Sequence, residues 1–518
     1  MVLTRPHLCF VLLCSLVSSA AGGQEPLLAH VSTSAVAPVL EGPPTLLGRQ
    51  ASAPQAAPNS SPPPGPQAWN EDAVLSADGP LLLGEERAFS LRSKRDSGAA
   101  YLAACSLGVE PGIATPAGRL GLAFDALLLS SLTGGPSFVD FQGSLDASGS
   151  ASFALAIPPA PGLLGASIAT AALVLDPQPQ ASGGIRRISN TLVRRVRLSD
   201  PQYDFTQVDA LLEQASDDWV FGRRGIAFAF VQNGELVHAS GVGGFTPATR
   251  VRLGSGTKWW SATALMTLVD DERVALDDPL SSELPFFFGP KRAITYRQAF
   301  SHTSGIDPGA SCLSDTSTTL EDCARAIAFT PLDTAPGSTF AYGGASMQCA
   351  GAAMETLVAD PFGRWVQRAV AAPIQARSFA YDGLGRTANP RVGGGGKCNA
   401  RDYARLLIAM LDGGAVDGTS LLSTDAVLTL LGDQIGGASF APTQQTNAVG
   451  YGLGVWRDRV DANGYAVEVS SPGAFGCYPW IDRELGYGAI VLIDRRLSDG
   501  IELVELLRPL LEREARKG

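Results

Sequence analysis

The stretch VRLGSGTKWWSATALMTLV, Val251 to Val269, places Ser255 three residues before Lys258 at the start of a helical pattern. Apolar residues recur after it with helical spacing, at Ala262, Leu265, Met266 and Val269. Counting back by helical steps puts Ser255 and Lys258 on or near the same inward face. A lysine on the inward face of a helix, one turn from a serine, needs a reason.

One reason is nucleophilic chemistry. The N–H groups at the start of a helix favour developing negative charge, and burial disfavours the charged form of a lysine. Such a lysine exchanges a proton with a neighbouring hydroxyl, which suits an activated serine. The motif by itself leaves a second interpretation open, because S-x-x-K is common by chance: Ser255 caps the helix and Lys258 reaches out to solvent.

Further segments follow in a characteristic order. They are ITYRQAFSHTSGI (294–306), APGSTFAYGGASMQCAG (335–351), NPRVGGGGKCNARDYARLLIAMLDGG (389–414), YGLGVW (451–456) and SSPGAFGCYPWID (470–482). With the Ser–Lys motif, this series resembles the serine β-lactamase and penicillin-binding-protein superfamily. The nearest branch is that of the class C β-lactamases with their esterase and D-aminopeptidase relatives. The resemblance covers about residues 204–516.

The resemblance implies catalytic roles. Ser255 matches the nucleophile, Lys258 its lysine partner, and Tyr342 the tyrosine of a Tyr-x-Asn motif, which acts as general base or proton shuttle. A phenol serves as a base only if nearby positive charge lowers its pKa, and we expect Lys258 to supply that charge. The backbone N–H groups of Ser255 and Ala474 are expected to form the oxyanion hole.

The substrate-binding positions depart from the family pattern. Gly344 stands where the family has the Asn of Tyr-x-Asn, and Ser471 stands where it has the Lys or His before Gly473. We expect Gly344, Ser471 and Gly473 to line the substrate site. The missing amide and cation weaken a β-lactamase or peptidase function, whereas a simple ester needs those contacts least.

Other candidate residues receive structural roles. The resemblance makes His302 a structural residue of the segment at the pocket rim, and the glycines 393–396 a lead into a helix. The acidic doublets 270–271 and 277–278 are interpreted as solvated or capping residues. Trp259 and Trp260 are either core or pocket wall, and the sequence does not separate the two.

The chain divides into four parts by composition. Residues 1–21 have a positive start, an apolar run and small residues, which predicts a secretory signal peptide. Residues 22–70 are rich in Pro, Ala and Ser, which predicts a disordered tether. Residues 71–198 alternate apolar and polar residues, which predicts a small β-sandwich. Residues 204–518 predict an α/β (α+β) domain of β-lactamase-like fold, with an antiparallel sheet flanked by helices and a helical lobe.

Turn signals predict two hairpins. Asp146 to Gly149 interrupts an alternating run in the β-sandwich region, and Asn233-Gly234 separates two apolar runs at the start of the larger domain.

Six cysteines remain after removal of the signal peptide, an even number that suggests disulfides in an exported chain. Cys312 and Cys323 flank a polar loop and are the favoured pair. Cys349 and Cys398 are a second candidate pair. Cys477 is either a free thiol or half of a disulfide.

Charge and composition exclude several functions. The net charge of −11 and the pI near 5.0 argue against nucleic acid as a partner, since that needs a basic face. No run after the signal reaches the ~20 apolar residues of a membrane span, so we do not expect an integral membrane protein. Scattered cysteines and few histidines predict no metal site, and the expected chemistry needs no cofactor.

We therefore expect an exported serine hydrolase, periplasmic or extracellular, with association with a surface left open, acting on a small-molecule or peptide substrate. The most favoured activity is that of a carboxylesterase. The alternative enzyme is a β-lactamase or D-Ala peptidase. An alternative from another class is a non-catalytic protein that binds a cell wall or surface through a decayed hydrolase site.

Overall fold

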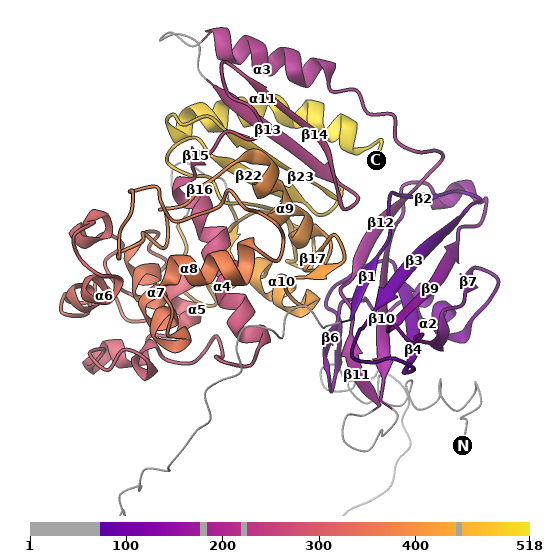
Figure 1. Cartoon of the computed structure of the whole chain (residues 1–518), viewed down its shortest axis with the longest axis horizontal. Coiled ribbons are helices and arrows are strands. Elements are labelled where there is room, and N and C mark those ends of the chain that lie inside the picture. Colours follow the sequence, from indigo (N-terminus) through magenta and orange to yellow (C-terminus); the bar gives the residue numbers. More distant parts are fainter. Residues whose placement is uncertain (1–72, 177–183, 219–224, 442–447) are drawn as a thin grey trace, which may run out of the picture.

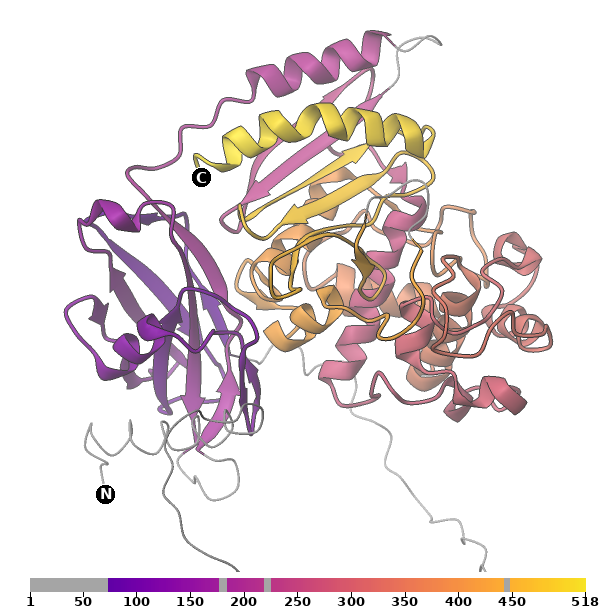
Figure 2. The same cartoon turned by 180° about the vertical axis from the view of Figure 1, so that it is seen from behind.

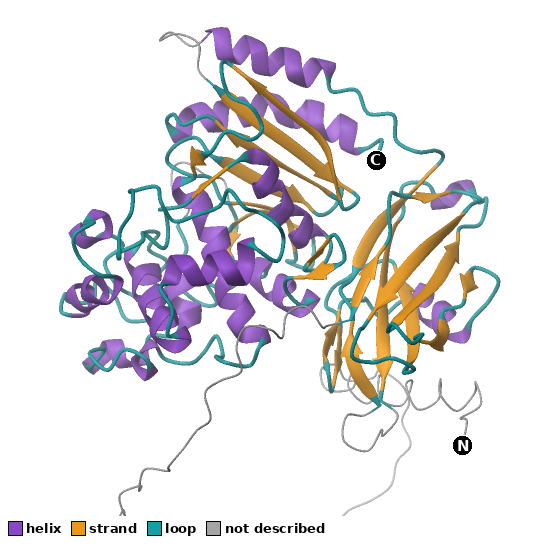
Figure 3. Ribbon diagram, viewed as in Figure 1, coloured by secondary structure: helices purple, strands orange, loops and turns teal. Residues whose placement is uncertain are grey.

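The computed structural model describes residues 73–176, 184–218, 225–441 and 448–518 (Figure 1). The predicted signal peptide and tether lie outside the described residues. The described chain has a strand-rich N-terminal unit and a larger unit in which helices and strands mix (Figure 3). It runs without regular structure from residue 198 to residue 205, and the division of the chain there stays a prediction.

Two sheets build the N-terminal unit. The first has the order β1-β3-β9-β7 and the second β2-β12-β10-β4-β8, with β11 beside β10 and a separate β5-β6 pair. Their strands are β1 (Val74–Ser76), β2 (Leu81–Leu82), β3 (Glu86–Arg92), β4 (Ala100–Ser106), β5 (Ile113–Thr115), β6 (Gly118–Leu120), β7 (Phe138–Val139), β8 (Gln142–Ser144), β9 (Ser150–Ala156), β10 (Ser167–Leu175), β11 (Ile185–Ile188) and β12 (Leu192–Arg197).

The two sheets share one hydrophobic core. Phe89 and Phe153 stack on each other from the first sheet and pack with Tyr101 and Val174 of the second. The second sheet is also covered on its other face, where Leu128 of helix α2 (Ala126–Thr133) packs among its side chains. Because both faces of that sheet are covered, β10 is buried along almost its whole length rather than alternating.

The predicted hairpin at Asp146–Gly149 is wrong. The turn itself forms, and the Gly149 N–H donates to the Asp146 carbonyl. However, β8 before it pairs with β4, and β9 after it pairs with β3, so the two strands belong to different sheets. The residues of the turn determine only that the chain reverses there. Burial in the shared core determines which strands β8 and β9 pair with.

An antiparallel sheet of seven strands forms the centre of the larger unit, in the order β14-β13-β23-β22-β21-β20-β19. The strands are β13 (Ile226–Gln232), β14 (Glu235–Val242), β19 (Gly450–Tyr451), β20 (Trp456–Val460), β21 (Ala466–Ser470), β22 (Tyr478–Asp482) and β23 (Tyr487–Leu492). The predicted hairpin between β13 and β14 is confirmed, with Asn233 and Gly234 at φ 54° and 83°, as a tight two-residue turn requires.

Helices cover both faces of this sheet. Helices α3 (Thr206–Asp218) and α11 (Leu497–Ala515) lie side by side on one face (Figures 1 and 2). There Leu212 and Leu507 pack against Phe228 and Phe230 of β13. Helices α4 (Thr257–Asp270) and α9 (Ala400–Leu411) lie on the other face, against Ala227 and Val231. This arrangement is the expected antiparallel sheet flanked by helices.

Helix α4 lies at the border between the sheet and the helical lobe. The lobe contains α5 (Tyr296–Phe300), α6 (Leu320–Ala328), α7 (Ala345–Val358) and α8 (Phe362–Val366), while α10 (Thr424–Leu431) packs against α4 from the side of the N-terminal unit. All residues of α4 from Thr257 to Leu268 are buried. The predicted single apolar stripe therefore understates its burial, because a helix enclosed on all sides has no solvent face.

The cysteines follow the sequence expectations in part. Cys312 and Cys323 form the predicted disulfide. The proposed pairing of Cys349 with Cys398 is wrong, since both are free, buried thiols. Cys349 is in the middle of α7, whereas Cys398 is in the short strand β16 (Lys397–Cys398) that pairs with β15 (Val251–Arg252). Cys477 is likewise free and buried.

Among the described helices, none is both long and apolar enough to cross a membrane. In the same ranges, no group of three or more His, Cys, Asp or Glu side chains is placed to hold a metal ion.

Candidate active site

The candidate nucleophile lies on a tight turn between β15 and α4. Gly254, Ser255 and Gly256 form one turn of 3-10 helix that runs directly into α4. Gly254 adopts φ 52°, a left-handed conformation that favours glycine, and a Cβ there would lie 2.7 Å from the Ala474 nitrogen. The sequence GSG therefore lets Ser255 sit at the helix start with a neighbouring strand end close against it.

Lys258 is buried next to the Ser255 hydroxyl. Its Nζ lies 3.1 Å from Ser255 Oγ and donates to the Gly393 carbonyl at 2.8 Å, and the side chain is only 3% exposed. Burial and, to a smaller extent, the positive charge of Arg391 together lower the pKa of Lys258 to about 7. A neutral amine keeps one lone pair, which can accept the serine proton while an N–H still donates to Gly393.

The glycine-rich segment Arg391–Gly396 runs along the start of α4. Besides the Gly393–Lys258 bond, Ser261 Oγ donates to the Val392 carbonyl at 2.6 Å, and the Gly396 N–H donates to Thr257 Oγ1 at 2.9 Å. A Cβ on Gly393 would lie 3.3 Å from Lys258 Nζ. The structural role expected for these glycines is only part of their use, because the Gly393 carbonyl also holds the Lys258 side chain in place.

Tyr342 lies on the other side of the lysine. Lys258 Nζ sits 4.7 Å from the centroid of its ring, in a cation–π geometry. Burial raises the pKa of Tyr342 to about 12, although hydrogen bonds to Ser255 and Trp456 and the charge of Arg391 act in the opposite direction. The expectation of a lowered phenol pKa is therefore wrong, and the residue whose pKa approaches neutrality is Lys258.

An aromatic cluster packs against the ring of Tyr342. It consists of His302, Phe340, Tyr451 and Trp456, whose ring centroids lie 4.8 to 6.5 Å from that of Tyr342. His302 is buried, and its Nε2 lies 3.3 Å from the Tyr451 hydroxyl. Its pKa is lowered well below the usual value by burial and by Lys258, so it is a neutral packing residue. These residues come from separate segments of the sequence, and only the fold brings them together around one tyrosine.

The Ala474 amide lies beside the nucleophile turn. A Cβ on Gly473 would be 1.9 Å from the Leu253 carbonyl oxygen, so only glycine allows the strand end this close. The Gly473 and Cys477 backbones then close a turn through a 2.8 Å hydrogen bond. Within the described residues, the Ala474 N–H is not paired with a backbone acceptor. The Ser255 N–H likewise has no backbone acceptor among the described residues, so the two N–H groups remain the candidates for an oxyanion hole.

The other two predicted substrate positions differ from each other. Ser471 is 2% exposed, and its hydroxyl lies 3.1 Å from the carbonyl oxygens of both Ser255 and Gly454. Its hydroxyl is directed at these backbone carbonyls and braces the turn that carries Ser255. Gly344 is at the start of α7, where its N–H donates to the Pro308 carbonyl at 2.9 Å. It adds no polar side chain to the site.

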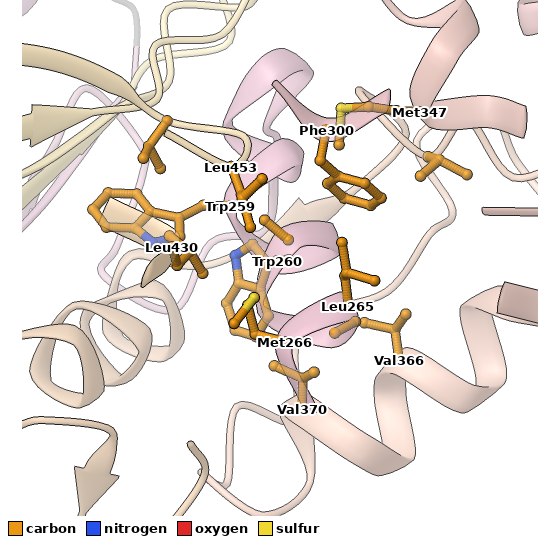
Figure 4. Packing of buried hydrophobic residues seen from close by; sticks show 14 of the residues in the cluster. Trp259, Trp260, Leu265, Met266, Phe300, Met347, Val366, Val370, Leu430 and Leu453 are labelled. Carbon is orange, nitrogen blue, oxygen red and sulfur yellow. The ribbon is translucent and has the colours of Figure 1, made fainter. Parts of the chain in front are cut away.

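The two tryptophans after Lys258 belong to the core. Trp259 and Trp260 are fully buried among Leu430, Leu453 and Met266 (Figure 4). Trp260 stacks on Phe379 with ring centroids 4.0 Å apart. The open question of core or pocket wall is answered in favour of the core, which makes α4 a rigid base for Ser255 and Lys258.

Comparison with known families agrees with this geometry. The family model described as Beta-lactamase matches residues 208–508. The chain belongs to the beta-lactamase family. The match spans more than half of the chain and includes all of the positions discussed above, so the family resemblance seen in the motifs is confirmed.

Individual relatives support the family and the fold. A structure of a "putative beta-lactamase" from Bacteroides dorei DSM 17855 is 30% identical, covers 60% of this chain and 99% of its own, and has a TM-score of 0.54. The structure of SurE with D-Leu is 23% identical, with a TM-score of 0.50, over 60% of this chain and 75% of its own. Protein flp of Staphylococcus aureus (strain MW2) is 24% identical over 172 residues, which are 30% of this chain and 34% of that protein. The chain thus spans about a third of the length of the curated relatives it matches.

Proposed function

We propose that this protein is an exported serine hydrolase that cleaves esters through an acyl-enzyme on Ser255. The observation that carries the proposal is the position of Lys258, buried 3.1 Å from Ser255 Oγ with its pKa lowered to about 7. A general base is most effective when its pKa lies near the working pH. Burial without a carboxylate partner therefore turns an ordinary cation into a base for the serine hydroxyl.

Acylation then uses Lys258, two backbone N–H groups and Tyr342. Neutral Lys258 accepts the proton of Ser255 as Oγ bonds to the ester carbonyl carbon, and the negative charge formed on the carbonyl oxygen is held by the N–H groups of Ser255 and Ala474. Tyr342, neutral because its pKa is about 12, passes a proton to the departing alkoxide and is reprotonated from Lys258. The C–O bond of the ester breaks, the alcohol leaves, and both side chains return to their starting protonation states.

Deacylation repeats these steps with water in place of the alcohol. Water gives up a proton as it attacks the acyl carbon, and the Ser255 oxygen takes a proton back as it leaves. The products are a carboxylic acid and a free enzyme.

The substrate positions favour an ester over an amide. Gly344 offers no side-chain amide, and Ser471 faces backbone carbonyls instead of the pocket. A peptide or lactam gains binding energy and leaving-group assistance from such groups, whereas an alkoxide or phenoxide departs more easily.

Labelling of the purified protein with a fluorophosphonate tests this proposal. We expect the wild type to be labelled, and Ser255→Ala and Lys258→Ala to remain unlabelled while still folded by circular dichroism. A folded wild type that neither reacts with the probe nor cleaves any ester would favour the non-catalytic binding alternative. Ester hydrolysis that persists at the full rate in Ser255→Ala would show that the mechanism is wrong.

Hydrolysis of β-lactams is the second candidate, because the relative from Bacteroides dorei carries that description and is 30% identical. A fluorescent penicillin separates the two activities in the same experiment. Labelling of Ser255 by the penicillin, with turnover of a chromogenic cephalosporin, would place β-lactams first; a Ser255 that reacts only with the fluorophosphonate supports the esterase.

Export rests on the N-terminal sequence and agrees with the Cys312–Cys323 disulfide, since such bonds persist in oxidising compartments. Expression of the full chain in a secreting host, followed by N-terminal sequencing of the mature protein, is expected to reveal cleavage near residue 21. A full-length protein retained in the cytoplasm would contradict this part of the proposal.

A further inference from the structure

Arg391 is held rigidly at its backbone. Gln348 of α7 donates from Nε2 to the Pro390 carbonyl at 3.0 Å and accepts at Oε1 from the Val392 N–H at 3.0 Å, which fixes the residues on either side. Asn389 is buried, and it too is bonded to Gln348, at 2.8 Å. These bonds to both neighbouring residues fix where the Arg391 side chain begins.

The guanidinium lies over Gly394, next to the nucleophile turn. A Cβ on Gly394 would lie 3.4 Å from Arg391 Nε on one side and 3.8 Å from the Gly254 carbonyl carbon on the other. The charge of Arg391 also acts on the pKa of both Lys258 and Tyr342, which agrees with a position at the catalytic pocket.

Arg391 has no counter-ion in the described part of the chain, although it is partly buried. Three other enclosed arginines are paired with carboxylates: Arg194 with Asp412, Arg483 with Glu110, and Arg508 with Glu468. Neither a hydrogen bond nor an ion pair joins the guanidinium of Arg391 to another described residue. An arginine presents a planar fork of donors that matches a carboxylate, and desolvation without a partner is unfavourable.

We propose that Arg391 binds a carboxylate on the substrate, which makes this protein selective for esters that carry a negative charge beside the scissile bond. The inference rests on the proposed esterase function and deepens it by naming a substrate class. The family position that would supply a cation is Ser471 here, and it supplies none. Arg391 provides a cation from the segment that also binds Lys258.

Two matched pairs of esters test the proposal and show whether the carboxylate is recognised on the acyl side or on the alcohol side of the ester. For the acyl side, the pair is p-nitrophenyl hydrogen adipate and p-nitrophenyl adipamate. For the alcohol side, it is the pentanoyl esters of p-hydroxybenzoate and of p-hydroxybenzamide. The readout is the ratio of kcat/KM, charged over neutral, in the full-length mature protein at pH about 9, where Lys258, whose pKa is about 7, is neutral.

The wild type is expected to prefer the charged member of at least one pair by about tenfold to hundredfold, the range of a charge-assisted hydrogen-bonded pair. Arg391→Met is expected to remove that preference, and Arg391→Lys to keep part of it, since lysine retains the charge without the fork. Arg292→Met, an exposed arginine in the helical lobe, is the matched control and should leave the ratio unchanged.

A wild-type enzyme that cleaves neutral and charged members equally, or an Arg391→Met variant with an unchanged ratio, would overturn this inference and leave the esterase proposal intact. If Ser255 reacts neither with an ester nor with the fluorophosphonate, the proposed function itself is overturned. If Arg391→Met does not fold, competitive inhibition of the wild type decides: adipate must inhibit at least about tenfold more strongly than adipamide, as expected for a lost ionic hydrogen bond.

Discussion

One buried cation lies at the contact between the two units and another lies in the catalytic pocket, and their pKa values are shifted in opposite directions. Arg194 of β12 is 2% exposed and makes a bidentate pair with Asp412, with N–O distances of 2.8 and 3.0 Å. Burial opposes its charge, but Asp412 outweighs burial, and the pKa of Arg194 is raised. Lys258 is equally buried, but among the described residues it contacts a hydroxyl, a carbonyl and an aromatic ring and pairs with no carboxylate. Burial, with the charge of Arg391, lowers its pKa.

The difference shows what a partner decides. A buried cation with a carboxylate stays charged and holds two elements together, here the N-terminal unit and the loop after α9. A buried cation without one loses its proton near neutral pH and becomes a base. The same desolvation is therefore outweighed by a carboxylate at Arg194, whereas at Lys258 it brings the pKa close to neutral pH.

The largest effect is expected at the pocket. Lys258→Met keeps the apolar stem but removes the base, so kcat/KM for a neutral ester should fall by about 10²- to 10⁴-fold, the usual contribution of a positioned general base. Steady-state kinetics measures the loss, and Lys94→Met, an exposed lysine of the N-terminal unit, is the control. A fall of less than tenfold would mean that another group deprotonates Ser255.

Loss of the paired cation should act on stability instead. Arg194→Met leaves Asp412 buried without its partner, and the free energy of unfolding should fall by about 3–5 kcal/mol. Guanidinium chloride denaturation followed by fluorescence gives the value. The double variant Arg194→Met/Asp412→Leu is expected to recover most of the loss, because it removes both charges. A double variant no more stable than the single one would contradict this account of the pair.

A smaller effect is expected for Tyr342→Phe. The phenol is neutral and donates a proton to the leaving group, so its loss should matter more for an alkyl ester than for a p-nitrophenyl ester. We expect kcat/KM to fall by about tenfold to hundredfold for an ethyl ester and by much less for the activated ester. Equal losses for both esters would assign Tyr342 to the deprotonation of Ser255 rather than to the leaving group.

The smallest effect is the pH dependence within the wild type. Lys258 acts in its neutral form, and its pKa is about 7, so kcat/KM should rise with pH and reach half of its plateau near that value. Because Arg391 lowers this pKa, Arg391→Met should move the midpoint to higher pH. A pH titration with a neutral ester measures both. A midpoint that moves to lower pH in the variant would contradict the assignment of Lys258 as the base.

Much of the fold was predictable from local patterns. The hairpin at Asn233-Gly234, the helix after Ser255 and the Cys312–Cys323 pair all depend on residues close in sequence, where turn chemistry and helical spacing act directly. The pairing of β8 with β4 and of β9 with β3 was not predictable, since both choices satisfy the same turn at Asp146–Gly149.

The site shows the same limit. Ser255, Lys258 and Tyr342 were recognisable from motif order, and the structure brings them together. The roles of Gly393, Ser471 and Arg391 were not, because each depends on contact with a segment more than a hundred residues away. The pKa of Tyr342 was predicted to be lowered, but it is raised. The positive charge nearby was visible in the sequence, whereas the extent of burial was not.

The sequence by itself determined the family, the order of the reactive residues and the glycines that allow close backbone approach at Gly254 and Gly473. Only the tertiary structure decided the charge of Lys258. Its nearest neighbours along the chain, Thr257 and Trp259, say nothing of its partner, which is a carbonyl 135 residues away in sequence. A pKa depends on everything that replaces water around a group, and that surrounding exists only once the sheet, the helical lobe and the segment 391–396 have packed around α4.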